Sequence, residues 1–363
     1  MEIDARVEAW ASLQLVPGLN ARALVALLTA FGGPEEVLAA SRASLGKVVP
    51  AELATALARG AEPTQLGHVL TWLAQPGHAL LAWDDPAYPR ALLTIGDPPP
   101  TLHYVGNVDL LNRPALAIVG SRNATAQGRE NAEAFASTLA AAGLVIISGL
   151  AQGIDAAAHR GGLAGAGSSV AVVGTGIDRI YPAANKDLAH RLAERGGLLS
   201  QFPLGTPPLP GNFPRRNRVI SGLVRGVLVV EATPNSGSLI TARFAAEQGR
   251  EVFAIPGSIH SPFSKGSHRL IKDGAKLVET AQDVLEELGL GSAGTTARPA
   301  AAKSAPVGDA ARVLAALGHD PVGVDALVER TGLAAHAVTA ALVELALDGQ
   351  VAPLPGGAFQ RVM

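Results

Sequence analysis

From residue 115 to residue 278 the chain repeats one unit, a short and continuously apolar run followed by a stretch in which apolar residues recur at helical spacing. Continuous apolar runs between amphipathic helices are typical of a parallel sheet that helices cover on both faces. The predicted strands are 115–119, 144–147, 169–173, 197–202, 227–230, 251–255 and 276–278, and the predicted helices are 127–142, 155–164, 185–195, 216–224, 239–248 and 267–273. We therefore predict an α/β fold with an extended Rossmann-like, doubly wound parallel sheet.

The residues before this repeat predict a separate helical domain. In residues 1–75 apolar residues recur at helical spacing, with a hydrophobic-Pro-Gly-hydrophobic turn at 16–20. Two helices around such a turn resemble a helix-hairpin-helix (SAM-like) unit, whose turn amides can hold a nucleic-acid phosphate. Arg22 is the sole cation near the turn, which favours instead a bundle that only packs. A connecting segment at 76–110 then leads to the Rossmann-like domain at 111–290.

The end of the chain predicts a linker and a winged-helix domain. Residues 291–308 are rich in Ala, Gly, Ser, Thr and Pro without apolar periodicity, so we expect a flexible linker. Residues 309–363 predict three helices and a β-ribbon, the order of a winged helix. Most such domains place the third helix in the major groove of duplex DNA. Here that helix, 334–348, contains no Lys or Arg, so we expect the domain to bind protein rather than duplex DNA.

Charge is divided unevenly along the chain. The formal net charge is −2, yet residues 111–308 carry +6 between flanks of −5 (residues 1–110) and −3 (residues 309–363). Such an asymmetry can mark a polyanion-binding domain between domains with other roles.

Composition excludes several other classes of protein. The chain contains no Cys, which excludes disulfide scaffolds and thiolate metal sites. Its first residues are charged, and its apolar runs are far shorter than the roughly 20 residues of a membrane span. We therefore expect a cytoplasmic protein with no membrane partner.

Glycine and small polar residues follow most predicted strands, directly before the next helix. In a parallel sheet these turns share the carboxyl edge, where ligands bind. Glycine allows close approach to the backbone, and helix amides and hydroxyls donate hydrogen bonds to anions, although a glycine can also be present only for its backbone angles. The candidate residues are Gly120, Ser121, Arg122, Ser148, Gly149, Gly174, Thr175, Ser236 and Ser238.

Several such turns along one edge suit a row of phosphates, as in a nucleic-acid strand, better than a single pyrophosphate. Neither G-x-G-x-x-G after the first predicted parallel strand nor G-x-x-x-x-G-K-[ST] occurs. A dinucleotide or nucleoside triphosphate is therefore not indicated, and no cofactor is expected.

The segment 212–218, Asn-Phe-Pro-Arg-Arg-Asn-Arg, concentrates cations within a window, residues 201–230, that holds no Asp or Glu. Arginine suits phosphate through its planar fork of donors, and Phe213 can stack on an unpaired base. The alternative is that these arginines pair with acidic groups distant in the sequence. The candidate residues are Phe213, Arg215, Arg216, Asn217 and Arg218.

Catalytic candidates are fewer. Asp155 and His159 lie four residues apart on one predicted helix and could form an acid/base pair, although a helix-capping Asp and a hydrogen-bonded His are the commoner roles. The nine His residues show no metal-ligand spacing. Glu231, at a strand end, could be the general base of a nucleotide hydrolase, but no nucleophile elbow accompanies it.

Six ordered motifs resemble the DprA (Smf, DNA processing protein A) family. They are GSR at 120–122, SGLAQGID at 148–155 with Ala158 and His159, GTGID at 174–178 with Tyr181, Pro182 and Asn185, FPRRNR at 213–218, EA at 231–232 with SGSL at 236–239, Thr241 and Ala242, and PG at 256–257. The flanking domains also resemble the family's longer members, so the resemblance covers nearly the whole chain.

The resemblance implies a non-enzymatic, cytoplasmic single-stranded DNA-binding protein of natural transformation and recombination. Such proteins protect incoming strands and help to load a RecA-type recombinase, usually as a homodimer through the Rossmann-like domain. The resemblance assigns DNA contacts to Arg122, Phe213, Arg215, Asn217 and Arg218, with backbone and hydroxyl contacts from the turn residues given above.

One departure from the family pattern is Gln201, where Glu is expected in many members. If the Glu of those members holds a loop or an arginine, the same loop or arginine must be held by a different contact in this chain. The alternative on the same sheet is a nucleotide-binding enzyme similar to phosphoribohydrolases of the lysine-decarboxylase-like group, with Glu231 as a catalytic residue. The chain lacks the Pro-Gly-Gly-x-Gly-Thr turn of those enzymes.

Overall fold

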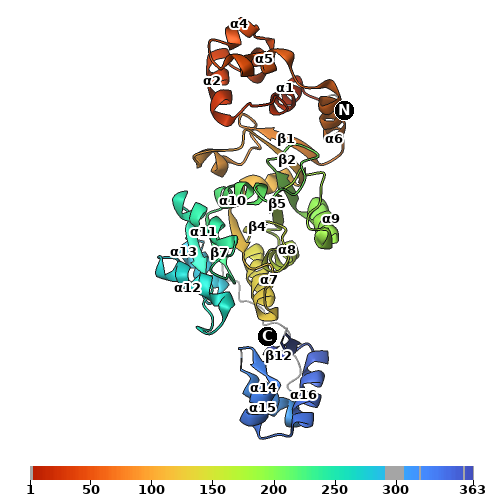
Figure 1. Ribbon diagram of the computed structural model, residues 1–363, viewed down its shortest axis with the longest axis vertical. Coiled ribbons are helices and arrows are strands. Elements are labelled where there is room, and N and C mark those ends of the chain that lie inside the picture. Colours follow the sequence, from red (N-terminus) through yellow and green to blue (C-terminus); the bar gives the residue numbers. More distant parts are fainter. Residues whose placement is uncertain (1–2, 291–305, 319, 355, 363) are drawn as a thin grey trace.

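The computed structural model describes residues 3–290, 306–318, 320–354 and 356–362. The central domain lies between the N-terminal helices and the C-terminal domain (Figure 1). It contains a nine-stranded sheet in the order β1-β2-β6-β5-β4-β3-β7-β8-β9. Its parallel strands are β3 (Ala115–Val119), β4 (Val145–Ser148), β5 (Ser169–Val172), β6 (Gly197–Ser200), β7 (Gly226–Val229), β8 (Glu251–Ala254) and β9 (Lys276–Leu277). All seven lie where the apolar runs predict them, so the doubly wound α/β fold is confirmed.

Helices cover both faces of this sheet, which explains why its central strands, β3 to β7, are buried at every position. Ala117 and Val119 of β3 share one core with Val219 of α10, whereas Leu116 of β3 shares another core with Leu139 of α7. The helices of the domain are α7 (Ala126–Ala141), α8 (Ile154–Ala164), α9 (Lys186–Arg195), α10 (Asn212–Gly222), α11 (Ser238–Glu247), α12 (Lys265–Lys272) and α13 (Ala281–Glu287).

The direction of winding reverses at β3. This strand pairs in parallel with β4 on one side and with β7 on the other, although β7 follows it by more than a hundred residues. The connections that leave β3 and β7 therefore diverge and open a crevice at the carboxyl ends of the two strands. This switch point is where a ligand site is expected.

The segment at 76–110, expected as a connection, contributes two strands to the sheet. β2 (Thr101–Gly106) pairs antiparallel with β6, and β1 (His78–Ala82) pairs antiparallel with β2. Tyr104 of β2 is fully buried. The sequence pattern missed both strands because a proline-rich excursion, and no amphipathic helix, separates them, whereas the partner of β2, strand β6, lies about a hundred residues further along the chain.

The residues before β1 form a helical domain. Its helices are α1 (Ala5–Gln14), α2 (Ala21–Phe31), α3 (Pro34–Ala39), α4 (Arg42–Leu45), α5 (Ala51–Arg59) and α6 (Pro63–Leu73). The predicted Pro-Gly turn joins α1 to α2, and Gly18 adopts a positive φ of 80° there. Asn20 then caps α2 by accepting a hydrogen bond from the amide of Ala23 at 2.9 Å.

The C-terminal residues form the predicted winged helix. Helices α14 (Gly308–Leu317), α15 (Val324–Thr331) and α16 (Ala335–Leu347) carry a small antiparallel sheet of β10 (Val322–Gly323), β12 (Ala358–Arg361) and β11 (Val351–Pro353). The predicted linker at 291–308 lies mainly outside the described residues. None of the described helices is by itself long and apolar enough to cross a membrane. Helices α15 and α16 reach that length and composition only when taken together, and the chain bends sharply between them.

Candidate nucleic-acid interface

A pocket of about 710 Å³ opens at the carboxyl ends of β3 and β7, and we call it the switch-point pocket. The turn after β3, helix α10 and the turn before α11 form its walls. The predicted site residues that line it are Gly120, Ser121, Arg122, Phe213, Arg216, Asn217, Ser236 and Ser238. Segments more than a hundred residues apart in the sequence therefore meet at one crevice.

Helix α10 turns one face towards the switch-point pocket. Phe213, Arg216, Asn217 and Ile220 line it, at the i, i+3, i+4 and i+7 positions that share a helix face. Arg215 lies off this face, and its guanidinium carbon is 5.5 Å from the centroid of the Phe202 ring. Helix α10 therefore directs the arginines of the acid-free segment to different sides, so they do not all face one ligand.

Arg216 forms the floor of the pocket and is only 5% exposed. Its guanidinium donates hydrogen bonds to the carbonyl oxygens of Gly149, at 2.6 Å, and Val172. Burial lowers the pKa of Arg216 to about 10, while the carboxylate of Asp155 opposes that shift. Arg216 thus stays protonated at neutral pH and gives the pocket floor a fixed positive charge.

The turn after β4 holds Asp155 and His159. The amides of Gly149 and Ala151 donate to Asp155 Oδ2 at 3.1 and 3.3 Å, and the amide of Leu150 donates to His159 Nε2 at 3.3 Å. The structure thus corrects the expectation that the amides of this turn hold a phosphate, because three consecutive amides already have partners inside the protein.

Gly149 and Gly174 serve the site as spacers. A Cβ atom on Gly149 would lie 2.6 to 2.7 Å from the guanidinium of Arg216, and a Cβ atom on Gly174 would lie 2.9 Å from the ring of Phe213. Both distances are shorter than van der Waals contact. The two glycines therefore allow Arg216 and Phe213 to lie directly on the strand ends.

Two predicted hydroxyl contacts are used within the protein. Ser148 and Thr175 are fully buried, and their hydroxyls donate to the carbonyl oxygens of Ile118 and Arg179, each at 2.7 Å. Neither hydroxyl reaches the switch-point pocket, because that of Ser148 holds the end of β4 to β3 and that of Thr175 holds the turn after β5. Ser236 and Ser238 do line the pocket, with their hydroxyl oxygens 2.7 Å apart.

An aromatic pair forms the accessible part of the pocket. The rings of Phe213 and Tyr181 lie 5.8 Å apart, and Tyr181 is 45% exposed. The guanidinium carbon of exposed Arg122 is 5.8 Å from the centroid of the Phe213 ring, on which Arg216 also converges at 6.0 Å. Aromatic rings beside arginines provide a surface for unpaired bases and their phosphates.

Tyr181 was not among the candidate site residues, although it belongs to the quoted motifs. The available signal was a tyrosine shortly after a glycine-rich turn, in a chain with only three Tyr residues. Nothing in the sequence indicated that Tyr181, in the loop after β5, would contact Phe213, which lies 32 positions later on α10.

Arg218 is held away from the switch-point pocket. It forms an ion pair with Asp97 at 3.5 Å and donates a hydrogen bond to Gln201 Oε1 at 2.8 Å, and its burial lowers its pKa. For Arg218 the structure therefore supports the alternative that an arginine of this segment pairs with a distant acid. The same contact shows what replaces the expected Glu at position 201, since the amide oxygen of Gln201 accepts where a carboxylate would.

The catalytic candidates have structural partners. His159 Nδ1 lies 2.8 Å from the hydroxyl of Ser169, and burial lowers the pKa of His159 to about 3. The carboxylate of Glu231 accepts from the amide and hydroxyl of Thr125, at 2.9 and 2.6 Å, and thereby ties β7 to the start of α7. Burial raises the pKa of Glu231. Within the described ranges no cluster of three His, Asp or Glu residues suits a metal ion.

The fold and the pocket define the class: a Rossmann-like protein with a cationic, aromatic pocket at its switch point and an appended winged helix. The model of the DNA recombination-mediator protein A family matches residues 79–289, and that of the DprA winged helix domain matches residues 297–357. The chain belongs to the DNA recombination-mediator protein A (DprA) family, as the motifs indicated. The family match begins inside β1, in agreement with the place of β1 in the sheet.

Curated relatives agree with this assignment. The chain is 46% identical over 294 residues to protein Smf of Escherichia coli K12, an alignment that covers 79% of each chain. It is 51% identical over 203 residues to DNA processing protein DprA of Streptococcus pneumoniae, which covers 56% of this chain and 72% of the relative.

Solved structures show the same fold. The X-ray structure of DprA from S. pneumoniae has a TM-score of 0.68 and 40% identity, and covers 79% of this chain and 99% of its own. A structure of DNA processing protein A from Helicobacter pylori has a TM-score of 0.54 and 30% identity, and covers 58% and 95%. The latter work concerns the single-stranded DNA binding mode of that protein.

Proposed function

We propose that this protein binds single-stranded DNA in the switch-point pocket. The observation that carries the proposal is the contact of Phe213 with Tyr181 between two arginines, exposed Arg122 at the rim and buried Arg216 on the floor. Of the residues that line this pocket one is acidic, Asp155, and its carboxylate already accepts two backbone amides. The relative from H. pylori, which binds single-stranded DNA, supports the same ligand.

The role that we propose for each residue of the pocket follows from how exposed its side chain is. Arg122 is exposed and would contact phosphate, while Phe213 and Tyr181 would stack on unpaired bases. Arg216 would attract the strand through its charge without leaving the floor. Gly120, Ser121, Asn217, Ser236 and Ser238 would supply short-range polar and backbone contacts along the walls.

The other predicted residues have indirect roles in this proposal. Gly149 and Gly174 position Arg216 and Phe213, while Ser148 holds the end of β4 to β3 and Thr175 holds the turn that carries Gly174. Arg218 orients α10 against Asp97 and Gln201. Arg215 is exposed beside the pocket face of α10 and would contribute only to long-range attraction.

In the cell we propose that the protein acts in natural transformation and recombination, without catalysis, in the cytoplasm. It would protect incoming single strands and help to load a RecA-type recombinase, as a homodimer through the Rossmann-like domain. The winged helix supports a role in protein contact, because the exposed face of α16 carries His336, Thr339 and Val343 rather than cations. Recombinase loading is tested by strand exchange on protein-coated single strands, with and without the full-length chain.

The central test is a salt titration of the full-length chain against a single-stranded oligonucleotide and its duplex. We expect tighter binding to the single strand, because stacking on Phe213 and Tyr181 requires unpaired bases. Equal affinity for the duplex would contradict the proposal. The absence of catalysis is tested by incubation with nucleoside monophosphates, and release of free base that is abolished in Glu231→Gln would contradict it.

A further inference from the structure

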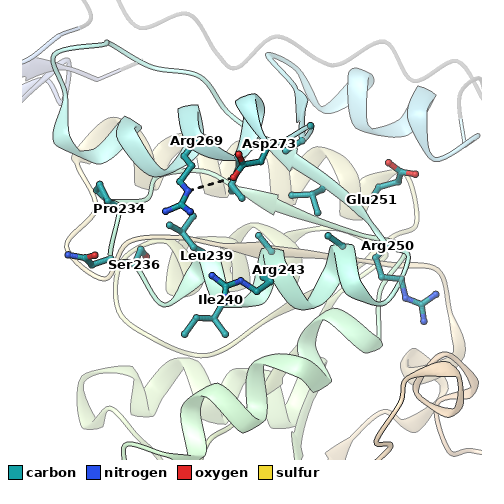
Figure 2. A pocket seen from close by; sticks show the side chains of 16 residues that line it. Pro234, Ser236, Leu239, Ile240, Arg243, Arg250, Glu251, Arg269 and Asp273 are labelled. Carbon is teal, nitrogen blue, oxygen red and sulfur yellow. Dashed lines mark ion pairs between the residues drawn. The ribbon is translucent and has the colours of Figure 1, made fainter.

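A second hollow, of about 560 Å³, lies between α11 and α12, and we call it the α11–α12 groove (Figure 2). Leu239, Ile240 and Leu270 contribute apolar surface to it, and arginines from both helices project over it. Ser236 and Ile240 line this groove and also the switch-point pocket. The two hollows therefore meet at the beginning of α11.

The arginines of the groove are placed along its course. Figure 2 shows Ser236 near one end, Arg250 and Glu251 near the other, and Arg243 and Arg269 between them. Arg243 follows Ile240 by three residues, or about one helical turn. A strand that left the switch-point pocket past Ser236 would therefore meet Arg269, with its partner Asp273, and Arg243 before it reached Glu251 of β8.

These two arginines are available to a ligand, unlike the third. The side chain of Arg269 is 67% exposed and its ion pair with Asp273, at 3.6 Å, is an exposed pair of the kind that contributes little. Arg243 is exposed on α11. Arg250, in contrast, donates to the carbonyl oxygen of Ala91 at 3.1 Å and to the hydroxyl of Thr94 at 2.8 Å, so its guanidinium ties the turn between α11 and β8 to the segment between β1 and β2.

We propose that the α11–α12 groove is a second subsite for the same DNA strand, in which Arg243 and Arg269 contact phosphates beyond the nucleotides held in the switch-point pocket. The inference rests on the proposed function. The groove offers apolar surface and two exposed arginines, with the carboxylates of Asp273 and Glu251 also in its lining, but no aromatic ring among the residues that line it, so it binds the strand through its backbone and without base preference. An acidic peptide would also match the charge, but continuity with the switch-point pocket favours DNA.

The experiment measures the affinity of the full-length chain for oligo(dT) of increasing length, from about 4 to about 16 nucleotides, the span of typical single-strand sites. The variant is Arg243→Ala/Arg269→Ala. The matched control is Arg191→Ala/Arg195→Ala, which removes two exposed arginines of α9 that line neither hollow. Arg122→Ala is measured in parallel, and circular dichroism checks that every variant is folded.

We expect the double variant to bind the shortest oligonucleotides as the wild type does and to lose roughly tenfold on the longest, with a salt dependence shallower by about 1.4, or about 0.7 for each lost phosphate contact. The α9 control should lose little at either length. Wild-type affinity of the double variant for the longest oligonucleotide would overturn the subsite.

In that case, loss of oligoglutamate binding in the double variant would assign the groove to an acidic protein segment. The proposed function fails separately, because it requires Arg122→Ala to weaken binding at every length.

Discussion

Arg216 lies directly on Gly149: its guanidinium donates to the Gly149 carbonyl oxygen at 2.6 Å, and a Cβ on that glycine would lie 2.6 to 2.7 Å from the guanidinium. A buried cation needs partners on every side, and here the strand ends supply carbonyls while Asp155 supplies opposite charge. The turn after β4 is thus built around an arginine 67 residues away rather than around a ligand. The charge of the pocket floor depends on that glycine.

We expect Gly149→Ala to displace Arg216, to destabilise the fold by about 1–3 kcal/mol, as overpacking commonly does, and to weaken single-strand binding. Urea unfolding and a binding titration measure the two effects. Gly237→Ala is the matched control, because Gly237 lines the same pocket with a negative φ and open space where its Cβ would be. Equal losses in both variants would show that crowding of Arg216 is not the cause.

Arg122 and Arg218 form a second matched pair. Arg122→Ala should weaken single-strand binding and reduce the salt dependence by about 0.7, the value for one phosphate contact on a single strand. Arg218→Ala should leave the salt dependence unchanged, because its guanidinium is already paired with Asp97 and Gln201. It should instead lower the free energy of unfolding by about 1–3 kcal/mol, since the Gln201 oxygen loses its donor. If Arg218→Ala reduced the salt dependence of binding and Arg122→Ala did not, the DNA contact would be assigned to Arg218 instead.

The aromatic pair makes a separate prediction. Phe213→Leu and Tyr181→Leu keep apolar volume but lose a stacking surface, so each should cost about 1–3 kcal/mol of binding free energy without changing the salt dependence. Tyr181→Phe retains the ring and should bind as the wild type does. If Tyr181→Leu also bound normally, Tyr181 would have only a packing role against Phe213.

Stability should decrease in mild acid. Burial lowers the pKa values of His159 and His103 to about 3 and about 4, from an ordinary value of 6.5. The unfolded chain therefore binds protons below about pH 6.5 that the folded chain rejects, so acid favours unfolding. Each histidine should cost up to about 1.4 kcal/mol per pH unit between those limits.

Urea unfolding at about pH 7 and about pH 5 measures this effect. His159→Gln should show a shallower dependence than the wild type, whatever its absolute stability. A free energy of unfolding that stayed constant or rose on acidification would contradict the prediction.

Local pattern was enough to predict the parallel strands, the helices between them and the winged helix. Each of these elements shows its periodicity within a dozen residues, because burial on two faces or on one stripe constrains neighbouring positions directly. The motifs likewise placed Arg122 and Phe213 at one sheet edge, since parallel strands share the direction of their carboxyl ends. β1 and β2 escaped prediction because only pairing with β6 reveals them.

The sequence could not assign roles within the arginine cluster of α10. Helical periodicity separates Arg216 from Arg218 by nearly half a turn, but it does not say which side meets the pocket. Packing against β3, β5 and β7 supplies that answer: it directs Arg216 to Gly149 and Val172 and leaves Arg218 to Asp97, 121 residues earlier. Composition and motifs were enough to predict that arginines gather at the carboxyl edge of the sheet. Only long-range contacts decided which of these arginines remain accessible. The physical reason is that an arginine is paired by the groups that the fold places beside it, and not by its neighbours in the chain.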